Sequence, residues 1–309
     1  MSGIVTLTIN PGIDTNTRVP HVMAEHKLRC SAPSHEPGGG GINVSRALAR
    51  LGGDSLAVFP GGKNFGDMLK GLLERDGVNY RSTPISGEIR ENFIILEESS
   101  GQQFRFGMPG PTISEKEWKS LLDELDSLHS APEYIIGSGS LPPGVPDDFY
   151  AHLAKKAAGL GAKCIVDTSG QALRHSLKLP LYLIKPNLNE LRMISGKDIG
   201  DDQTIEGCAR ELIEKGSVEI IAISLGAAGA LVVTSDECVR IHAPTVQIVS
   251  KVGAGDSMVA GIVIGLTRGF SVVDAVRFGV AAGAAAVMTP GTELCRKEDT
   301  ERLYERMST

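Results

Sequence analysis

Strand-like and helix-like segments alternate along most of this chain, and this alternation limits the fold more than any other feature. Short apolar runs at 134–136, 164–166 and 182–184 indicate strands, and longer runs such as 205–215 and 272–288 indicate helices. Parallel strands need a crossover that covers the sheet, so repeated strand–helix units predict a mainly parallel sheet flanked by helices. We therefore expect an α/β fold in one large domain spanning 1–309.

Two segments interrupt this alternation. Residues 12–37 contain no helical period, and residues 87–108 alternate polar and apolar side chains on either side of Gly101, which is typical of a hairpin. We expect both segments to leave the main domain and form a small separate sheet. A sheet with one apolar face has to cover something, so we expect a β-sheet lid over a substrate cleft or against a partner subunit.

Composition argues against several classes of partner and location. The net charge of −6 provides no overall field that would attract nucleic acid or an anionic membrane. The five cysteines are far apart, and no C-x-x-C pair indicates zinc or a disulfide framework. The N-terminus lacks the features of a signal peptide, and no apolar run approaches the roughly 18 residues of a membrane helix. We therefore expect a cytoplasmic protein with reduced thiols.

Polar and glycine residues gather directly after the predicted strands. In open α/β sheets, ligands bind beyond the carboxyl ends of the strands, so these residues are candidates for one site. Any one of these loops fits ordinary turn chemistry, but six of them together favour a shared site. The candidates are Asp14, the glycine run 38–41 with Asn43, Ser140, Lys185 with Asn187 and Glu190, Ser224 with Gly226, and the run 253–256.

The last of these runs, GAGD at 253–256, precedes an apolar run at 258–266 that indicates a buried helix. A small-residue turn that opens a helix leaves free N–H groups at the positive end of the helix dipole, which is a ready anion site. The Asp256 carboxylate would repel a phosphate. It fits a base that accepts the proton of a hydroxyl while the amides hold the charge of a transferring group. The alternative from this motif alone is an Asp cap on a buried helix.

Two common nucleotide-binding motifs are missing from the sequence. The nearest approach to a P-loop, GGKN at 61–64, lacks the hydroxyl residue and the first glycine. The run GSG at 137–139 has Pro142 where a G-x-G-x-x-G motif needs its third glycine. A P-loop NTPase and a Rossmann dehydrogenase therefore both lose support.

Three motifs together resemble the ribokinase-like sugar kinases of the PfkB family: GGGGINV at 38–44, KPNLNE at 185–190 and VGAGDS at 252–257. The resemblance extends over nearly the whole chain and implies the ribokinase-like fold. Further details, such as KLRC at 27–30 and VRFGVAAG at 276–283, are similar to the members that phosphorylate fructose 6-phosphate. The implied activity is the ATP-dependent phosphorylation of fructose 6-phosphate to fructose 1,6-bisphosphate.

The resemblance also implies a role for each matching residue. Asp256 would be the base on the acceptor hydroxyl, and the amides of Gly253, Ala254 and Gly255 would form the anion hole. The implied sugar-binding residues are Asp14, Gly38, Gly39, Asn43 and Ser140, with Lys27 and Arg90 on the phosphate of the sugar. The implied ATP-binding residues are Lys185, Asn187, Ser224, Gly226 and Gly229.

Metal ions complete the implied site. Asn187 and Glu190 would organise magnesium and its waters. Such kinases often bind potassium near the anion hole, and the matching positions are Ser250, Val252, Ala286, Thr289, Gly291 and Glu293. Glu293 departs from the pattern, because similar kinases carry a basic residue there, and a backbone carbonyl ligand would tolerate that change.

Other functions stay open at this point. A kinase for fructose 1-phosphate or tagatose 6-phosphate is the nearest alternative, although such relatives tend to carry Lys where this chain has Gly40. A non-catalytic sugar-phosphate sensor on the same fold is an alternative of another class, and the retained Asp256 argues against it. A dehydrogenase comes third. We also expect a homodimer through the lid, with apolar residues such as Phe93 and Ile95 paired across subunits.

Overall fold

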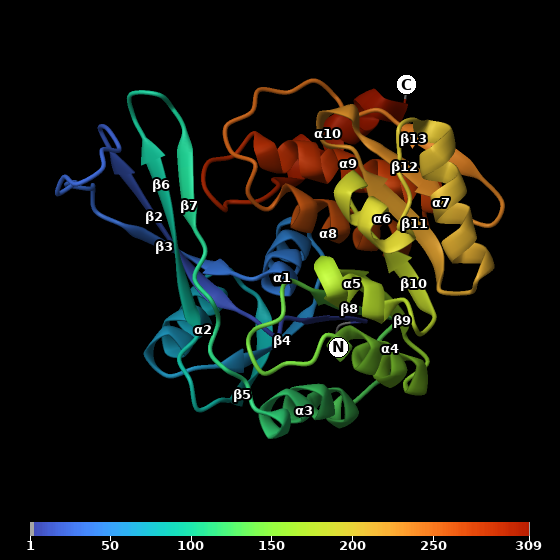
Figure 1. Cartoon of the computed structure of the whole chain (residues 1–309), viewed down its shortest axis with the longest axis horizontal. Coiled ribbons are helices and arrows are strands. Elements are labelled where there is room, and N and C mark those ends of the chain that lie inside the picture. The colour runs from blue at the N-terminus through green and yellow to red at the C-terminus, as the bar shows by residue number, and fades with distance from the viewer. Residues whose placement is uncertain (1–2, 309) are drawn as a thin grey trace.

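A nine-stranded sheet forms the centre of the computed structural model, which describes residues 3–308 (Figure 1). The strand order is β13-β12-β11-β10-β9-β8-β1-β4-β5. The strands from β11 to β5 are parallel, whereas β12 and β13 are antiparallel additions at one edge. The strands are β1 Ile4–Leu7, β4 Leu56–Gly61, β5 Asn79–Pro84, β8 Tyr134–Ser138, β9 Lys163–Asp167, β10 Leu181–Ile184, β11 Val218–Ser224, β12 Ala230–Val233 and β13 Cys238–Ile241.

Helices cover both faces of this sheet, because successive strand side chains point to opposite faces. In β8, Ile135 packs into the core beneath α3 to α7, while Tyr134 and Ile136 pack into the core beneath α1, α8, α9 and α10. The helix α2 extends the second layer over β4. The helices are α1 Gly40–Arg50, α2 Asn64–Arg75, α3 Glu115–Asp123, α4 Phe149–Gly159, α5 Gly170–Ser176, α6 Leu188–Ser195, α7 Asp202–Glu214, α8 Ala254–Thr267, α9 Val272–Val287 and α10 Lys297–Ser308.

The helices α8 and α9 pack against each other almost backbone to backbone. A Cβ atom on Gly261 would lie 2.8 Å from the Cα atom of Gly279, and a Cβ atom on Gly265 would lie 2.7 Å from the Cα atom of Ala275. A Cβ atom on Gly279 would lie 2.7 Å from the Met258 carbonyl oxygen. The glycines therefore permit an approach between the two helices that a side chain at these positions would prevent.

A second, four-stranded sheet stands beside the main domain (Figure 1). Its order is β3-β2-β6-β7, and it consists of β2 Gly12–Val19, β3 Ser34–Gly38, β6 Arg90–Glu97 and β7 Gln103–Phe106. These strands come from the two segments that interrupt the strand–helix alternation. The register places Asp14 opposite Asn92 and Glu36 on one face, and places Phe93 opposite Phe106 on the other face.

The fold predicted from the sequence is confirmed, with differences at element ends. The sequence predicts a first strand over residues 4–10, but this strand ends at Leu7, since Thr8 to Asn10 turn away toward the small sheet. The sequence interpretation missed β5, β12, β13, α3, α5 and α10, because these segments are short or amphipathic; β12 is apolar but has only four residues. None of the helices within residues 3–308 has the length and apolar character needed to span a membrane. The cysteines are free thiols.

Candidate active site

The turn before α8 has the geometry of an anion site. Gly253 adopts φ 72° and ψ 5°, in the left-handed region, and a Cβ atom on it would overlap the Leu294 side chain. The first helical hydrogen bond runs from the Ser257 N–H to the Gly253 carbonyl at 2.8 Å. The N–H groups of Ala254, Gly255 and Asp256 therefore have no carbonyl partner in the first turn, and they lie at the positive end of the helix dipole.

Asp256 lies partly buried in this first turn. Asn43 Nδ2 donates a hydrogen bond to Asp256 Oδ2 at 2.9 Å. Burial and the charge of Asp167 raise the pKa of Asp256 to about 7, although the Asn43 hydrogen bond and the Lys185 ammonium lower it and Asp14 adds a small increase. A carboxylate with a pKa near neutrality can accept a proton from a reacting group and release it again.

Lys185 supplies a buried positive charge beside the same turn. Its Nζ lies 3.2 Å from Asp167 Oδ1, and a Cβ atom on Gly255 would lie 3.4 Å from that Nζ. Burial disfavours the ammonium, but the charges of Asp167, Asp256 and Glu190 outweigh this effect and raise the Lys185 pKa. Lys185 is therefore charged next to the free amides.

A small polar cavity of about 220 Å³ opens in front of Asp256. Its walls come from the start of α1, the loops after β8 and β9, and α6. The lining residues are Gly40, Ser138, Gly139, Ser140, Asp167, Thr168, Ser169, Glu190 and Asp256. Gly40 is tightly placed in this wall, because a Cβ atom there would overlap the Ser138 hydroxyl and lie 2.8 Å from the Gly139 nitrogen.

The small sheet brings a second carboxylate to this region. Asp14 is 8% exposed, and Asn92 Nδ2 donates to its Oδ1 at 2.8 Å. Burial raises the pKa of Asp14, opposed by the Asn92 hydrogen bond and the Arg90 charge. A Cβ atom on Gly38 would lie 2.7 Å from Asp14 Oδ1, so the glycine leaves room for the carboxylate.

Arg90 and Lys27 occupy different places. Arg90 opposes Gly12 in the register of β2 and β6, two residues from the Asp14–Asn92 pair, and its buried Nε has no hydrogen-bond partner among the described residues. Lys27 lies exposed in the loop between β2 and β3, and it makes no ion pair or hydrogen bond within residues 3–308. Because β2 runs away from the site for eight residues, this loop is at the outer end of the small sheet (Figure 1).

A larger cavity of about 490 Å³ lies on the other side of the α8 N-terminus. Its walls are mostly apolar and come from the loops after β11 and β13 and from α8 and α9. The lining residues are Ser224, Gly226, Ala227, Gly229, Ala243, Pro244, Thr245, Val246, Ile248, Lys251, Ala254, Gly255, Met258, Val280, Gly283, Ala284 and Val287. Ala254 and Gly255 belong to this wall, whereas Asp256 faces the smaller cavity.

Asn187 and Glu190 form a reciprocal cap at the start of α6. The Asn187 N–H donates to Glu190 Oε2 at 2.8 Å, and the Glu190 N–H donates to Asn187 Oδ1 at 2.9 Å. Asn187 also bridges to Ser224 across the strand ends, while Glu190 lines the smaller cavity. This pair therefore stands between the two cavities. Residues 3–308 contain no group of three or more His, Cys, Asp or Glu side chains arranged to hold a metal.

The residues matched to potassium ligands gather around the loop after α9. Ser250 Oγ donates to the Gly291 carbonyl at 3.0 Å, and Thr289 Oγ1 donates to the Ala286 carbonyl at 2.8 Å. The Val252 N–H donates to Ser250 Oγ at 3.2 Å. The Glu293 carboxylate is engaged by Arg296 at 2.8 Å and by Arg50 at 3.9 Å. A contribution of Glu293 to a cation site would therefore come from its backbone.

Several polar residues of the site were missed by the sequence interpretation. Asp167 directly follows an expected strand, and Asn10 ends the first one, so the rule of strand ends applied strictly would have found both. Asn10 Nδ2 donates to Ser140 Oγ at 3.1 Å. Asn92 had no such signal, because its position depends on the pairing of β6 with β2.

Two cavities that meet at a free helix N-terminus, with a carboxylate in the smaller one, define a phosphotransferase of the ribokinase-like type. A family model for pfkB family carbohydrate kinases matches residues 7–299. The chain belongs to this family.

Named relatives and solved structures agree with this family. The ATP-dependent 6-phosphofructokinase isozyme 2 of Mycobacterium tuberculosis is 42% identical over 98% of this chain and 89% of its own length. The isozyme of Escherichia coli is 40% identical over the full length of both. The 1-phosphofructokinase of Bacillus subtilis is 31% identical over 94% of this chain and 95% of its own. The E. coli phosphofructokinase-2 in complex with potassium superposes with a TM-score of 0.96 at 40% identity, covering both chains completely.

Proposed function

We propose that this protein transfers the γ-phosphoryl group of ATP to fructose 6-phosphate and forms fructose 1,6-bisphosphate. One observation carries the proposal: the first turn of α8 is shared between the two cavities, with its amides at the junction and Asp256 in the smaller cavity. A nucleotide on one side and a sugar on the other would bring the phosphoryl group and the acceptor hydroxyl together at this turn.

The chemistry assigned to this turn is simple. The acceptor oxygen forms a bond to the γ-phosphorus, the bond from that phosphorus to the β–γ bridging oxygen breaks, and the acceptor proton passes to Asp256. In a loose transition state the hydroxyl is deprotonated late, so a well-placed carboxylate suffices. The free amides of Gly253, Ala254 and Gly255 and the Lys185 ammonium stabilise the charge on the transferring group.

The acceptor is assigned to the smaller cavity and the small sheet. Asp14 accepts hydrogen bonds from sugar hydroxyls, Gly38 and Gly39 let the sugar lie close to the backbone, and Asn43 and Ser140 complete the contacts. The unpartnered Nε of Arg90 supports a role on the phosphate of the sugar, because a buried N–H donor without an acceptor is costly and a phosphate oxygen would supply that acceptor. The small sheet then acts as the lid.

The nucleotide is assigned to the larger cavity. Its apolar walls on α8 and α9 fit a flat base, and Ser224, Gly226 and Gly229 line the part that follows β11. The phosphate chain would extend from there past Asn187 and Lys185 to the helix N-terminus. The same fold, at 19% identity and a TM-score of 0.77, is found in an Arabidopsis thaliana ribokinase complexed with ribose and ATP.

Metal ions fit two places. Asn187 and Glu190 stand between the cavities with oxygen atoms suited to water-mediated magnesium, which would neutralise charge on the phosphates. The loop after α9 offers carbonyl and hydroxyl oxygens to potassium. Its implied ligands are Ser250, Val252, Ala286, Thr289, Gly291 and the backbone of Glu293. The complex of a 40% identical E. coli relative with potassium supports this assignment.

Fructose 6-phosphate is favoured over other sugars by the relatives and by Gly40. The E. coli phosphofructokinase-2 in complex with fructose-6-phosphate superposes with a TM-score of 0.94 at 39% identity. Gly40 leaves no space for the Lys expected in kinases for fructose 1-phosphate or tagatose 6-phosphate, because even a Cβ atom would meet Ser138 and Gly139. Because a 1-phosphofructokinase is among the relatives, phosphorylation of fructose 1-phosphate is the second candidate activity.

We also propose a homodimer through the lid. The face of the small sheet opposite Asp14 carries Phe93, Ile95, Phe104 and Phe106, and Phe106 is 46% exposed. A second copy of this chain would cover this face. Lys27 lies too far along β2 to reach the Arg90 region of its own chain, so Lys27 of the partner subunit is the better source for a phosphate contact.

A coupled assay of ADP release with MgATP tests the proposal. It compares fructose 6-phosphate, fructose 1-phosphate, tagatose 6-phosphate and unphosphorylated fructose, with the variant Asp256→Asn as the background control. A kcat/KM at least about tenfold higher for fructose 6-phosphate is expected. Preference for another sugar would overturn the assignment of fructose 6-phosphate as substrate, but the assignment as a kinase would stand. Ligand binding without ADP release from any sugar would favour the sensor.

A further inference from the structure

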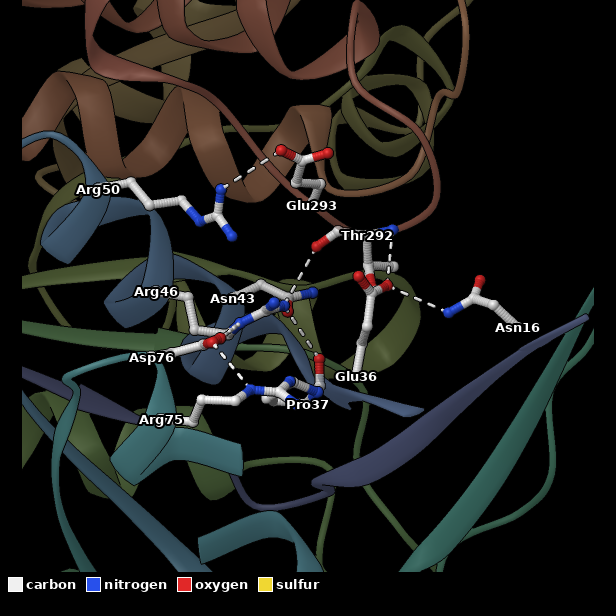
Figure 2. A network of polar contacts seen from close by, with 10 residues as sticks. All are labelled: Asn16, Glu36, Pro37, Asn43, Arg46, Arg50, Arg75, Asp76, Thr292 and Glu293. Atoms are coloured by element: carbon white, nitrogen blue, oxygen red, sulfur yellow. Dashed lines mark hydrogen bonds and ion pairs between the residues drawn. The ribbon is translucent and has the colours of Figure 1, made fainter. Parts of the chain in front are cut away.

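A buried arginine lies directly behind Asn43. Arg46, one turn further along α1, is 3% exposed and joins four segments of the chain (Figure 2). Its Nε donates to Asp76 Oδ2 at 2.7 Å, at the end of α2. Its Nη1 lies 3.2 Å from the carbonyl oxygens of Pro37 and Thr292 and 3.4 Å from Asn43 Oδ1. The guanidinium thus faces Asn43 from the side opposite Asp256.

This arrangement determines which way the Asn43 amide points. Arginine can only donate hydrogen bonds, so the amide atom that faces Arg46 has to be the oxygen. The amide nitrogen is then left to face Asp256, and it donates to Oδ2 at 2.9 Å. In the reversed orientation, the amide oxygen would face the Asp256 carboxylate and the NH₂ group would face the guanidinium. Both contacts would be repulsive.

We propose that Arg46 is a positioning residue that fixes Asn43 as a hydrogen-bond donor to Asp256. One carboxylate oxygen is thereby held in place, and the other is presented to the acceptor hydroxyl. Arg46 does not line the smaller cavity, so it acts through Asn43. The inference rests on the proposed role of Asp256 as the base in phosphoryl transfer.

The same guanidinium ties Asn43 to the lid and to the loop after α9. Pro37 belongs to the lid strand β3, and its neighbour Glu36 accepts hydrogen bonds from the Thr292 N–H at 2.9 Å and from Asn16 Nδ2 at 3.1 Å (Figure 2). The Thr292 hydroxyl also contacts Glu36. The Asn43 amide is therefore held against a frame that includes both segments.

Several charges act on Asp256 besides Asn43. Asp167 at the end of β9 and Asp14 of β2 favour its protonated form, and Lys185 after β10 favours its ionised form. Glu190 of α6 lines the same cavity. Arg46 makes no hydrogen bond or ion pair with any of these groups, and its charge is the smallest of the five influences on the Asp14 pKa. A change at Arg46 therefore reaches Asp256 mainly through Asn43. Loss of the oriented donor removes a stabilising contact of the carboxylate, and the Asp256 pKa should rise.

The variant Arg46→Gln tests this directly, because a glutamine amide can donate or accept and so cannot select the Asn43 orientation. Arg46→Gln combined with Asp76→Asn serves as a second variant, since it leaves no unpaired buried carboxylate. The matched control is Arg50→Gln on the same helix, which loses an ion pair to Glu293 but has no contact with Asn43.

The first readout is a carboxyl carbon NMR titration of aspartate-labelled protein, with the Asp256 signal assigned through Asp256→Asn. We expect the Asp256 pKa to rise by about one unit in both Arg46 variants and to stay unchanged in the control. The second readout is the pH profile of kcat with whichever sugar the natural protein phosphorylates. Its lower limb should move to higher pH by the same amount, with the KM for ATP within about twofold.

The outcomes separate cleanly. An unchanged Asp256 pKa in a folded Arg46 variant overturns the inference, as does a loss of kcat without displacement of the pH profile, which indicates a purely structural role. If the natural protein phosphorylates no sugar, the proposed function fails, and the titration still decides whether Arg46 orients Asn43.

Discussion

Lys185 Nζ lies 3.2 Å from Asp167 Oδ1, and this ion pair stands beside the free amides of α8. The chain as a whole has a net charge of −6, so its overall field does not attract a polyphosphate. A buried ammonium fixed next to a helix N-terminus offers a local positive potential instead. Because Asp167 holds the ammonium in place, Lys185 needs no rearrangement when an anion arrives.

Replacement of Asp256 by Asn should abolish most of the catalysis. An amide cannot accept the proton of the hydroxyl, so we expect kcat to fall at least ~10²-fold, with the affinity for ATP largely kept. Single-turnover and steady-state kinetics would measure both quantities. Asp274→Asn, near the start of α9 and outside both cavities, is the control. Near-normal turnover in Asp256→Asn would remove the base from the mechanism.

The pKa of Asp256 predicts the pH dependence of the reaction. The ionised carboxylate is the active form, so kcat should fall as the pH drops through about 7. Because one carboxylate has to be ionised, the fall should have the slope of a single proton. A profile that stays flat down to pH 5 would contradict the raised pKa. Asp256→Asn should lose this limb.

The same shift predicts a gain in stability at alkaline pH when Asp256 is neutralised. The folded state binds this proton more tightly than the unfolded state, so the stabilisation is complete below pH 3.8 and is lost as the pH rises through about 7. Asp256→Asn should therefore raise the melting temperature at pH 8 by several degrees and have little effect at pH 4. Equal melting temperatures of Asp256→Asn and the natural protein at pH 8, measured by calorimetry, would contradict a destabilising effect of the ionised Asp256.

Gly38→Ala should impair binding of the sugar and leave ATP binding intact. The added Cβ atom would lie 2.7 Å from Asp14 Oδ1 and push the carboxylate from its place. Loss of a charge-assisted hydrogen bond predicts a KM for the sugar phosphate raised about 10- to 100-fold. Gly71→Ala in α2 is the control, because nothing lies within 4 Å of a Cβ atom there. An unchanged KM for the sugar in Gly38→Ala would show that Asp14 does not bind the sugar.

A larger side chain in the apolar cavity should affect the nucleotide alone. Ala284 of α9 lines this cavity and is 9% exposed. We expect Ala284→Leu to raise the KM for ATP at least ~10-fold by filling space that the base needs, with the sugar KM within about twofold. Ala158→Leu on an exposed position of α4 is the control. A selective rise in the KM for the sugar would show that the sugar, and not the nucleotide, occupies the larger cavity.

A charge on the outer face of the lid should break the proposed dimer. Phe106→Glu places a carboxylate on the apolar face that a second copy would cover, so we expect a monomer in light scattering at micromolar concentration. Its KM for the sugar phosphate should rise, because the partner's Lys27 is lost. Met68→Glu, on the exposed surface of α2, is the control. A natural protein that is monomeric at every concentration would refute the dimer.

Much of this molecule could be predicted from the sequence because its chemistry is local. The run 253–256 carries its conformation in its own residues, since the left-handed Gly253 and the apolar run behind it define the turn and the helix. The strand-end rule likewise groups Ser140, Lys185 and Glu190 from the sequence alone. Each of these depends on neighbours in the sequence.

Contacts between distant segments could not be predicted in this way. From the sequence, Arg46 is indistinguishable from an exposed charged residue of an amphipathic helix. Only the fold brings Asp76, Pro37 and Thr292 around it. Asn92 reaches Asp14 only through the parallel pairing of β6 with β2, and parallel pairing leaves no turn signal in the sequence. Lys27 was matched to the phosphate by resemblance, and the sequence did not show that β2 carries its loop outward.

The close approach of α8 and α9 has a mechanical consequence. With glycine against backbone at several levels, the two helices cannot slide past each other without steric conflict, and separating them would expose a close-packed interface. The amides, Asp256 and the apolar wall of the larger cavity therefore belong to one stiff block. The small sheet is attached to the main domain where its strands enter and leave, through Ile13 in the core shared with α1 and α2, and through the contact of Glu36 with Thr292. We expect any closing movement around bound ligands to come from the outer part of this sheet, beyond these contacts. The main domain thus provides the rigid part of the molecule, and we expect the outer part of the small sheet to be the part that moves.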